Sequence, residues 1–267
     1  MNNQKNLWRY MIANIPLDIN YEPGKEWQLF YSDKEQKELP EFLIEIMDTV
    51  EEIHGIEYYC FKDRLCRVSR VETEVMLADK EWKKAIIMPP CNYSYVTSFF
   101  LQMFYTHAVK KQMLQMHSSL INTYGYGLMF LGSSGIGKTT QAELWNKYRE
   151  ALIINGDISF VQEIKGEFYG WGTPWHGSSP YCANTSVLLR AMIVLKQAPE
   201  NSIRELMGFE KVTAVSNSVF YPRWLENGME LCLETLDHLL TKLPVYELSC
   251  RPDEDAVKLT EETIFGG

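Results

Sequence analysis

A glycine-rich segment at residues 132–139 has the residue types and spacing that bind phosphate groups. It reads GSSGIGKT and fits the pattern G-x-x-x-x-G-K-[ST]. Glycines permit the backbone angles that turn successive N–H groups inward around an anion, and the positive end of a following helix adds to the attraction. The lysine then reaches the β and γ phosphates, and the threonine hydroxyl ligates Mg²⁺. We therefore expect this segment to bind a nucleoside triphosphate, with ATP and Mg²⁺ as the cofactors.

We assign the expected phosphate contacts to the whole loop and to the start of the helix after it. These residues are Gly132, Ser133, Ser134, Gly135, Ile136, Gly137, Lys138, Thr139 and Thr140. Lys138 is also expected to act in catalysis and Thr139 to hold the metal ion. The alternatives are a glycine-rich turn without a ligand, and a loop that binds anions but does no chemistry.

One aspartate follows the next apolar run, at residues 152–154. A carboxylate at the carboxyl end of a strand lies beside such a loop in a parallel sheet. Asp157 is therefore our candidate for holding Mg²⁺ through water, or for taking the proton from an attacking hydroxyl. The structural alternative is a capping or turn aspartate, since Gly-Asp pairs are common in turns.

Three further residues are candidates for contact with phosphate or substrate. His176 lies in the turn-rich segment GTPWHG, and loops carry a large share of binding residues. Arg190 and Arg251 could neutralise phosphate, because a guanidinium suits bidentate contact with it. The plain alternatives are a loop histidine, an exposed arginine and, around Arg251, the start of a helix capped by Asp253.

The elements that position these residues differ between the two halves of the chain. In residues 1–112, apolar runs predict strands at 7–13, 27–31, 56–61, 66–76 and 85–88, and apolar spacing predicts a helix at 40–53. A long apolar stretch predicts a buried helix at 95–111. We expect a small, mostly antiparallel α+β region here, whose role the sequence does not define.

Residues 113–267 show strands alternating with helices, which is typical of an α/β core. Strands are expected at 118–124, 128–131, 152–154, 191–196 and 245–250. Helices are expected at 139–148, 211–219, 222–243 and 253–264. The glycine-rich loop therefore follows a strand and opens a helix, as phosphate binding requires.

Several segments of this second region, in order, resemble the HPr kinase/phosphorylase family, whose fold is related to that of the ATP-dependent phosphoenolpyruvate carboxykinases. LGSSGIGKTT is similar to the family's loop, MHSSLINTYGYGLMFLG to the segment leading to it, and ALIINGDISFV to the strand that ends in catalytic acids. GTPWHG, NTSVLLRAMIVLKQ and VYELSCRPDEDAV extend the resemblance over about residues 115–255. It implies a P-loop core of the type in that family's C-terminal domain and in the carboxykinases. It also implies a role for His117, which matches the family's histidine before the loop, in orienting Asp157.

Two departures from the family bear on the chemistry. The family carries two adjacent aspartates where this chain has Asn155-Gly156-Asp157, so a single acid remains. No EIRGLGI-type segment is found, which argues against reversal of the phosphorylation and against HPr itself as the substrate.

The loop and the resemblance together favour an ATP-dependent kinase that transfers the γ-phosphoryl group to a hydroxyl. The acceptor would be a serine of a peptide or protein, or a small molecule. Two alternatives stay open: an accessory or regulatory protein that binds nucleotide without turnover, and a phosphoenolpyruvate carboxykinase-like enzyme acting on a small acid. For the second alternative, the sequence offers no basic pocket or second set of metal ligands that we can assign.

Composition and charge narrow the class of protein further. The chain of 267 residues has 26 Lys and Arg against 35 Asp and Glu, a net charge of −9 with no basic run, which disfavours a nucleic-acid partner. No apolar run is long enough for a membrane span and no signal peptide is recognised, so we expect a cytoplasmic protein. The six cysteines form no CxxC pair, so reduced thiols are expected in place of a zinc site. A homo-oligomer is left open.

Overall fold

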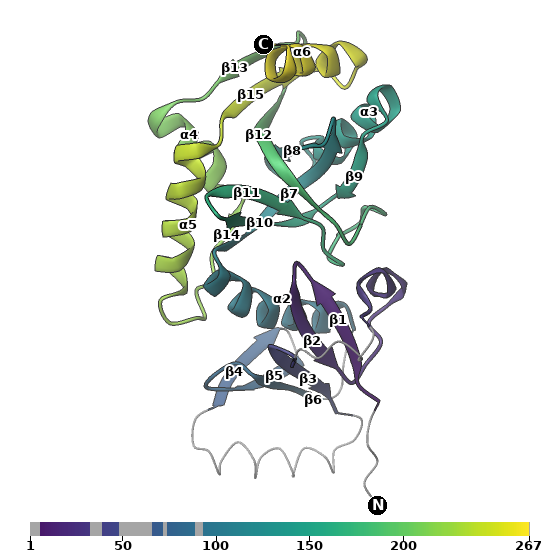
Figure 1. Ribbon diagram of the computed structural model, residues 1–267, viewed down its shortest axis with the longest axis vertical. Coiled ribbons are helices and arrows are strands. Elements are labelled where there is room, and N and C mark those ends of the chain that lie inside the picture. Colours follow the sequence, from purple (N-terminus) through teal and green to yellow (C-terminus); the bar gives the residue numbers. More distant parts are fainter. Residues whose placement is uncertain (1–5, 33–38, 48–65, 72–73, 89–92, 267) are drawn as a thin grey trace, which may run out of the picture. The chain divides into compact units, whose positions relative to one another are not determined.

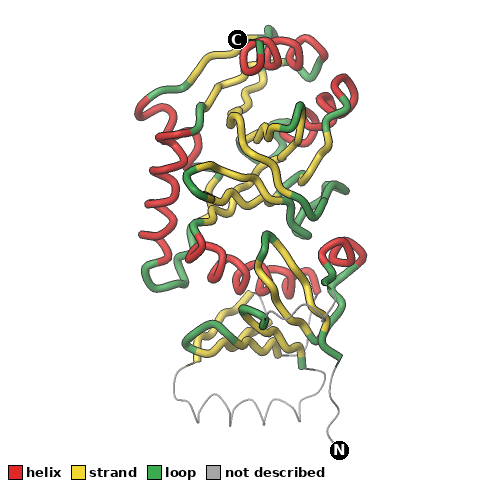
Figure 2. Tube along the Cα trace, in the orientation of Figure 1, coloured by secondary structure: helices red, strands yellow, loops and turns green. Residues whose placement is uncertain are grey.

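Two β-sheets with helices packed against them form a mixed α/β structure (Figures 1 and 2). This computed structural model describes residues 6–32, 39–47, 66–71, 74–88 and 93–266. The chain divides into two compact units, Met1–Ala108 and Val109–Gly267, whereas the sequence places the boundary after residue 112. Among the described residues, no helix is long and apolar enough to cross a membrane.

The first unit is built on a six-stranded sheet with the order β1-β2-β3-β6-β5-β4. Its strands are β1 (Trp8–Ile12), β2 (Ile15–Ile19), β3 (Phe42–Ile46), β4 (Cys66–Val71), β5 (Glu74–Asp79) and β6 (Lys84–Met88). β3 pairs in parallel with β2 and β6, and the other neighbours are antiparallel. Helix α2 (Tyr93–Ala108) packs against β4 and β5 and buries Phe99, Phe100 and Phe104.

The predicted helix at 40–53 is wrong over its described part, because β3 occupies Phe42–Ile46. Its apolar residues also alternate: Phe42, Ile44 and Ile46 are buried and the residues between them are half-buried. Hydrogen bonding to strands on both sides makes this segment extended, and the sequence pattern alone does not contain those partners. Residues 48–53, and the strand predicted at 56–61, lie outside the described residues.

Two further predictions for this unit need correction. The predicted strand at 27–31 is wrong over residues 27–30, which belong to the 3₁₀ helix η1 (Lys25–Phe30); η1 buries Trp27 and Phe30, three residues apart on one face. The single strand predicted at 66–76 is two strands, β4 and β5, which pair antiparallel. The strands predicted at 7–13 and 85–88 and the helix at 95–111 are confirmed by β1, β6 and α2.

The second unit contains a nine-stranded sheet whose main path is β11-β10-β7-β8-β12-β15-β13. The strands are β7 (Met113–Thr123), β8 (Tyr126–Leu131), β9 (Leu152–Asn155), β10 (Ile158–Ile164), β11 (Glu167–Trp171), β12 (Ser186–Gln197), β13 (Ser202–Glu205), β14 (Val219–Phe220) and β15 (Val245–Cys250). β9 and β14 both pair with β7. Because β11 also pairs with β12, the strands β7, β8, β12, β11 and β10 form a closed ring.

The helices of this unit are η2 (Val109–Lys111), α3 (Lys138–Arg149), α4 (Gly208–Ser216), α5 (Gly228–Lys242) and α6 (Glu254–Phe265). α3 and α6 contact each other, as Figure 1 also shows, and α5 packs against β7 and η2. Buried side chains of α3, α6 and the strands form one core. Its members include Ile121, Leu128, Phe130, Trp145, Ile193, Leu248 and Val257. This core fixes the end of β8 against the start of α3.

The strands and helices predicted for this region are confirmed in type, with shifted ends. The helix expected at 222–243 starts only at Gly228, and the one expected at 211–219 ends at Ser216, before β14. The strands β10, β11, β13 and β14 were not predicted.

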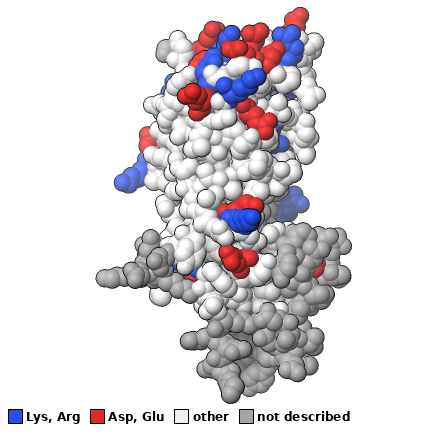
Figure 3. All heavy atoms as spheres, turned by 90° about the vertical axis from the view of Figure 1, so that its right-hand side faces the viewer, with Lys and Arg blue, Asp and Glu red and all other residues white. Residues whose placement is uncertain are grey.

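Charged side chains of both signs gather at the end of this unit that carries α3 and α6, on the face drawn in Figure 3. Arg149 Nη2 lies 2.7 Å from Glu261 Oε2, joining the two helices, and Lys258 Nζ lies 3.4 Å from Glu254 Oε1. Basic groups here are interspersed with acidic ones, which is a pattern of local pairing.

Candidate functional site

The segment between β8 and α3 is a turn held open by glycines. Gly132, Gly135 and Gly137 have φ angles of 137°, 77° and 114°, a region that favours glycine over residues with a Cβ. Gly137 is the N-cap of α3, and its carbonyl accepts a hydrogen bond of 2.9 Å from the N–H of Gln141. The loop therefore leads directly into the positive end of a helix of twelve residues.

Lys138 folds back over this loop. Its Nζ donates to the carbonyl oxygens of Gly132 and Ser133, at 3.1 Å each. The side chain is buried, and burial lowers the pKa of Lys138, against the opposing effect of the nearby Asp157 carboxylate. An ammonium group has three donors. Two of them anchor the lysine to the loop, and the third can donate to a phosphate oxygen.

Thr139 joins the loop to the turn after β9. Its Oγ1 donates to the carbonyl oxygen of Gly156, at 3.2 Å. Because the hydroxyl proton is used in this bond, the lone pairs of Oγ1 are left to a cation. Ser119 Oγ on β7 donates to the same carbonyl, at 3.1 Å, and so also holds the turn in place.

The loop and Asp157 meet because β7 lies between β8 and β9. Ser118 of β7 pairs with Leu131, the last residue of β8, and Leu120 pairs with Asn155, the last residue of β9. Both strands run antiparallel to β7, so their carboxyl ends arrive at the same place on it. The predicted reason, that a carboxylate at the carboxyl end of a strand lies beside the loop in a parallel sheet, holds only in part. β8 and β9 run parallel to each other, but the antiparallel strand β7 lies between them.

Asp157 is paired with His117. Nε2 of the imidazole lies 3.2 Å from Asp157 Oδ1, and both side chains are partly exposed. The hydrogen bond from His117 is the largest influence that lowers the pKa of Asp157, and the charges of His117, Lys138 and His176 act in the same direction. Burial of the carboxyl group raises this pKa, but the groups that lower it have the larger combined effect. Asp157 is therefore held ionised beside the loop.

Asn155 ties a second loop, at residues 172–181, to this turn. It is fully buried, and its Oδ1 accepts hydrogen bonds from the N–H groups of Asp157 and Ile158, at 2.8 and 2.9 Å. Its Nδ2 donates to the carbonyl oxygens of Thr173 and Trp175, at 3.0 and 3.1 Å. An amide makes both kinds of contact at once, which a carboxylate cannot do.

Close packing explains why only one acid stands here. A Cβ placed on Gly156 would lie 1.9 Å from Ser179 Oγ, so no larger side chain fits at that position. On the other side, a Cβ on Gly177 would lie 2.4 Å from Asp157 Oδ2. The 172–181 loop thus covers the turn so closely that Asp157 is its only carboxylate.

His176 enters the site from the same loop. Its Nδ1 is hydrogen-bonded to the carbonyl oxygen of Ser179, which can only accept, so Nδ1 carries the proton. In the neutral imidazole this leaves Nε2 as an acceptor. His176 lines the same cavity as Asp157, and its expected contact with phosphate or substrate stays a prediction.

These groups surround one cavity of about 530 Å³. Its lining residues are His117, Ser134, Gly135, Gly137, Lys138, Thr139, Thr140, Gly156, Asp157, His176, Ser178 and Ser179. Three loop residues from the sequence analysis do not line it: Gly132 and Ser133 hold Lys138 through their carbonyls, and Ile136 lines a neighbouring cavity. The cavity therefore brings residues of the glycine-rich loop together with Asp157, His117 and His176.

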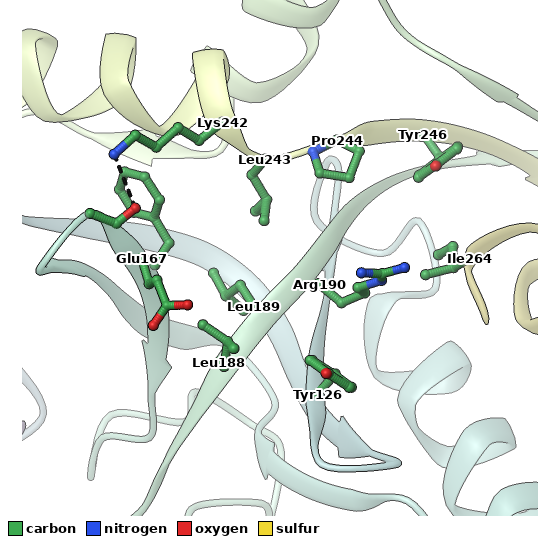
Figure 4. Close-up of a pocket in the computed structure, with 12 residues that line it drawn as sticks. Tyr126, Glu167, Leu188, Leu189, Arg190, Lys242, Leu243, Pro244, Tyr246 and Ile264 are labelled. Carbon is green, nitrogen blue, oxygen red and sulfur yellow. Dashed lines mark hydrogen bonds between the residues drawn. The ribbon is translucent and has the colours of Figure 1, made fainter. Parts of the chain in front are cut away.

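The two candidate arginines lie elsewhere. Arg251 lines the neighbouring cavity of about 320 Å³, which borders the loop, and its Nε donates to Asp253 Oδ2 at 2.8 Å. Arg190 is not near the loop, because it lies towards the start of β12, whereas Val194 of β12 is the residue that pairs with the end of β8. It lines a third cavity, of about 420 Å³, with its Cζ 5.9 Å from the Tyr126 ring centre (Figure 4). The prediction that Arg190 neutralises phosphate on this loop is therefore wrong.

Comparison with known proteins shows distant structural similarity at most. No family model matches the chain, and no curated protein matches it. The structure of the Hpr(Ser) kinase/phosphatase from Coxiella burnetii is similar to it, with 10% sequence identity and a TM-score of 0.34, over 56% of this chain and 95% of that one. A likeness at this level assigns no function.

The residues present fit a magnesium ion held jointly with phosphates. No group of three or more His, Cys, Asp or Glu side chains that could hold a metal ion occurs in the described part of the chain. Mg²⁺ bound with a nucleotide needs only one or two protein oxygens, because phosphates and water complete its shell. The Thr139 hydroxyl and the ionised Asp157 carboxylate line the same cavity and are oxygen ligands of this kind.

Sequence reasoning missed Asn155, Gly156, Gly177 and Ser179 as parts of the site. Their roles depend on the close approach of two loops that are separate in sequence. The only sequence signal was the density of Gly, Ser and Pro at residues 172–180, which marks a turn-rich segment.

Proposed function

We propose that this chain is an ATP-dependent kinase that transfers a γ-phosphoryl group to a hydroxyl. The observation that carries the proposal is the cavity in which Lys138, Thr139 and Asp157 face a common space. The N–H groups of the loop and the Lys138 ammonium bind the phosphates of the nucleotide, and the ionised Asp157 carboxylate lies beside them. The acceptor would be a serine of a peptide or protein, or a small molecule.

In this proposal the acceptor oxygen forms a bond to the γ phosphorus while the bond from that phosphorus to the β–γ bridging oxygen breaks. The proton of the acceptor hydroxyl passes to Asp157, which His117 keeps oriented and ionised. Lys138 donates to phosphate oxygens as charge develops on the leaving group. Mg²⁺ would be held by Thr139 Oγ1, with Asp157 placed to reach it through water, and when bound it offsets phosphate charge.

A binding protein without turnover is the second candidate. It is favoured by the turn Asn155-Gly156-Asp157, where the packing of Ser179 against Gly156 leaves no room for a second acid. Single acids do serve phosphoryl transfer when positioning and electrostatics carry most of the catalysis. Because Asp157 is also paired with His117, we favour the kinase.

The test is Mg²⁺-dependent turnover of ATP labelled at the γ position, with serine peptides and small hydroxyl compounds as acceptors. The wild type should hydrolyse ATP slowly and label an acceptor, and Asp157→Asn should lower the rate about 10²–10⁴-fold, the contribution of a general base. Nucleotide binding should persist in that variant. Asp237→Asn changes an exposed acid of α5 and serves as the control. Tight nucleotide binding without hydrolysis or transfer to any acceptor would favour the binding protein.

A further inference from the structure

The 172–181 loop brings a serine of the chain itself to the cavity that contains Asp157. Ser178 is exposed and is one of the residues that line this cavity. Within the described part of the chain, its Oγ takes part in no hydrogen bond. The hydroxyl is therefore not committed to holding the loop together and is available for a reaction.

A series of close approaches places Ser178 beside the acid of the site. Lys138 is near enough to Asp157 for its charge to lower the pKa of that carboxyl group, after the larger effect of the hydrogen bond from His117. Gly177 lies against the same carboxylate, because a Cβ placed on it would lie 2.4 Å from Asp157 Oδ2. Ser178 is the next residue along the chain. It therefore follows directly on the point where the loop contacts the acid.

The segment that carries Ser178 is held in place from both sides. The N–H of Ser179 donates to the carbonyl oxygen of His176 at 3.1 Å, which closes a turn around Gly177 and Ser178. Ser179 is buried, and its Oγ accepts from the N–H of Tyr181 at 3.1 Å. A hydroxyl that is already held in the site loses no translational freedom when it reacts, unlike a separate acceptor molecule.

We propose that the chain phosphorylates its own Ser178, in a reaction within one molecule. Ser178 Oγ forms a bond to the γ phosphorus of ATP while the bond from that phosphorus to the β–γ bridging oxygen breaks, and ADP leaves. The proton of the hydroxyl passes to Asp157. This inference rests on the proposed function, because it takes the ATP site and the base from it. It adds a modification site and an acceptor that belongs to the chain.

Three other groups of the cavity fit the role of acceptor less well. Ser179 is buried and its Oγ already serves the loop. His176 has its proton on Nδ1, so Nε2 has no proton to give to the ionised Asp157, and the base would have no part in the reaction. Ser134 belongs to the glycine-rich loop, where the phosphates themselves are expected to lie. Ser178 alone combines an uncommitted hydroxyl with a place next to the acid.

The first test is mass spectrometry of the full-length chain after incubation with Mg²⁺·ATP. The protein is first freed of phosphate with alkaline phosphatase, which is then removed. We expect a single phosphate per chain, and fragment sequencing should place it on Ser178. The phosphate should survive acid, as a phosphate ester does. No incorporation, phosphate on Ser134 or any other serine, or an acid-labile phosphate on His176 would overturn the assignment.

The second test follows incorporation in variants. Ser178→Ala should take up no phosphate, and Ser178→Thr, which keeps a hydroxyl, should be labelled at the same position. Asp157→Asn should lower the rate about 10²–10⁴-fold, the contribution of a general base. Ser202→Ala removes an exposed serine of β13 and should be labelled like wild type. Undiminished labelling of Ser178→Ala or of Asp157→Asn would contradict the proposal, as would a Ser178→Thr variant that binds Mg²⁺·ATP but stays unlabelled.

The third test asks whether the reaction occurs within one molecule. A reaction within the chain has an effective concentration that dilution does not change, so its rate constant should be the same after a dilution of about tenfold. A rate constant that falls in proportion to the protein concentration would show transfer between molecules and overturn this part of the proposal.

These experiments distinguish failure of the inference from failure of the proposed function. If ATP is hydrolysed, or its phosphate passes to an added acceptor, while Ser178 stays unmodified, the inference falls by itself. If ATP binds but its γ phosphate passes neither to water nor to any acceptor, the kinase and the inference fall together. The same holds if Mg²⁺·ATP does not bind.

Discussion

His117 and Asp157 form a pair in which the imidazole Nε2 lies 3.2 Å from a carboxylate oxygen. β7 brings His117 and the turn after β9 brings Asp157, so the pair exists only because those strands lie side by side. It places an ionised acid next to a lysine that is already bound to its loop. The chemistry proposed for this chain depends on that arrangement.

Removal of His117 should change the titration of Asp157. The hydrogen bond from His117 lowers the pKa of Asp157, so the pKa should rise towards the ordinary aspartate range in His117→Ala. Carbon-13 NMR of labelled carboxyl groups measures this directly. His238→Ala removes a histidine that contacts Glu163 and should leave Asp157 unchanged. An Asp157 titration that is identical in wild type and His117→Ala would contradict the pairing.

The same shift predicts a pH dependence of stability. Because the pKa of Asp157 is lower in the folded state, the ionised group stabilises the fold at pH above its ordinary range, and this contribution is lost as the pH falls through the depressed value. His117→Ala should therefore be less stable than wild type near neutral pH, and the difference should shrink in acid. Urea unfolding at several pH values tests this, and a constant difference would count against it.

Asn155→Asp should destabilise the protein even though it restores a second acid. The carbonyls of Thr173 and Trp175 would lose their donor, at roughly 1–3 kcal/mol each, so about 2–6 kcal/mol in all. The matched control is Asn146→Asp, which removes one hydrogen bond from an exposed side chain to Ala151. Denaturant unfolding compares the two, and equal losses would show that Asn155 does not fasten the 172–181 loop.

Gly177→Ala should lower the rate of phosphoryl transfer and spare nucleotide affinity. The new Cβ would lie 2.4 Å from Asp157 Oδ2, so the carboxylate must move, while the glycine-rich loop at 132–139 is untouched. Gly125→Ala controls for the backbone cost, because Gly125 also has a positive φ, of 80°, but nothing lies within 4 Å of its Cβ position. Steady-state kinetics should show a fall in kcat for Gly177→Ala alone. Equal kinetics in the two variants would be evidence that Asp157 does no chemistry.

Trp145→Ala should be among the most damaging changes in the core. Trp145 of α3 is fully buried in the core that α3 forms with the sheet and α6. Its replacement by alanine should lower the free energy of unfolding by about 3–5 kcal/mol. Leu152→Ala, at a side chain that is 51% exposed, should change stability by about 0.5 kcal/mol or less. Thermal unfolding measures both, and similar melting temperatures would contradict the core described here.

The loop and its flanks could be predicted from sequence because their signals are local. The GSSGIGKT pattern, the apolar run of β8 and the helix after it lie within one short segment, and each supports the others. Asp253 was likewise recognised as a cap, and its Oδ1 accepts from Ala256 N at 3.1 Å. Such features need no knowledge of distant partners.

Several of the missed features depend on residues far apart in the chain. β3 was taken for a helix because its two partner strands could not be known, and the ring closed by β11 and β12 involves pairing that no local pattern encodes. Gly156 and Gly177 appeared as turn residues, although contacts with Ser179 and Asp157 decide their identity. Arg190 was assigned to phosphate from the chemistry of its side chain, because the sequence did not show where along β12 it lies relative to the loop.

Calorimetric titration of Mg²⁺·ATP into wild type and Lys138→Ala tests most directly whether the loop grips a triphosphate. Lys147→Ala removes an exposed lysine of the same helix and is the control. We predict saturable binding to wild type and to Lys147→Ala, and affinity about 10–150-fold weaker in Lys138→Ala, from the loss of a charge-assisted hydrogen bond. An absence of heat with ATP, ADP and GTP, or an affinity that Lys138→Ala leaves unaltered, would contradict the account.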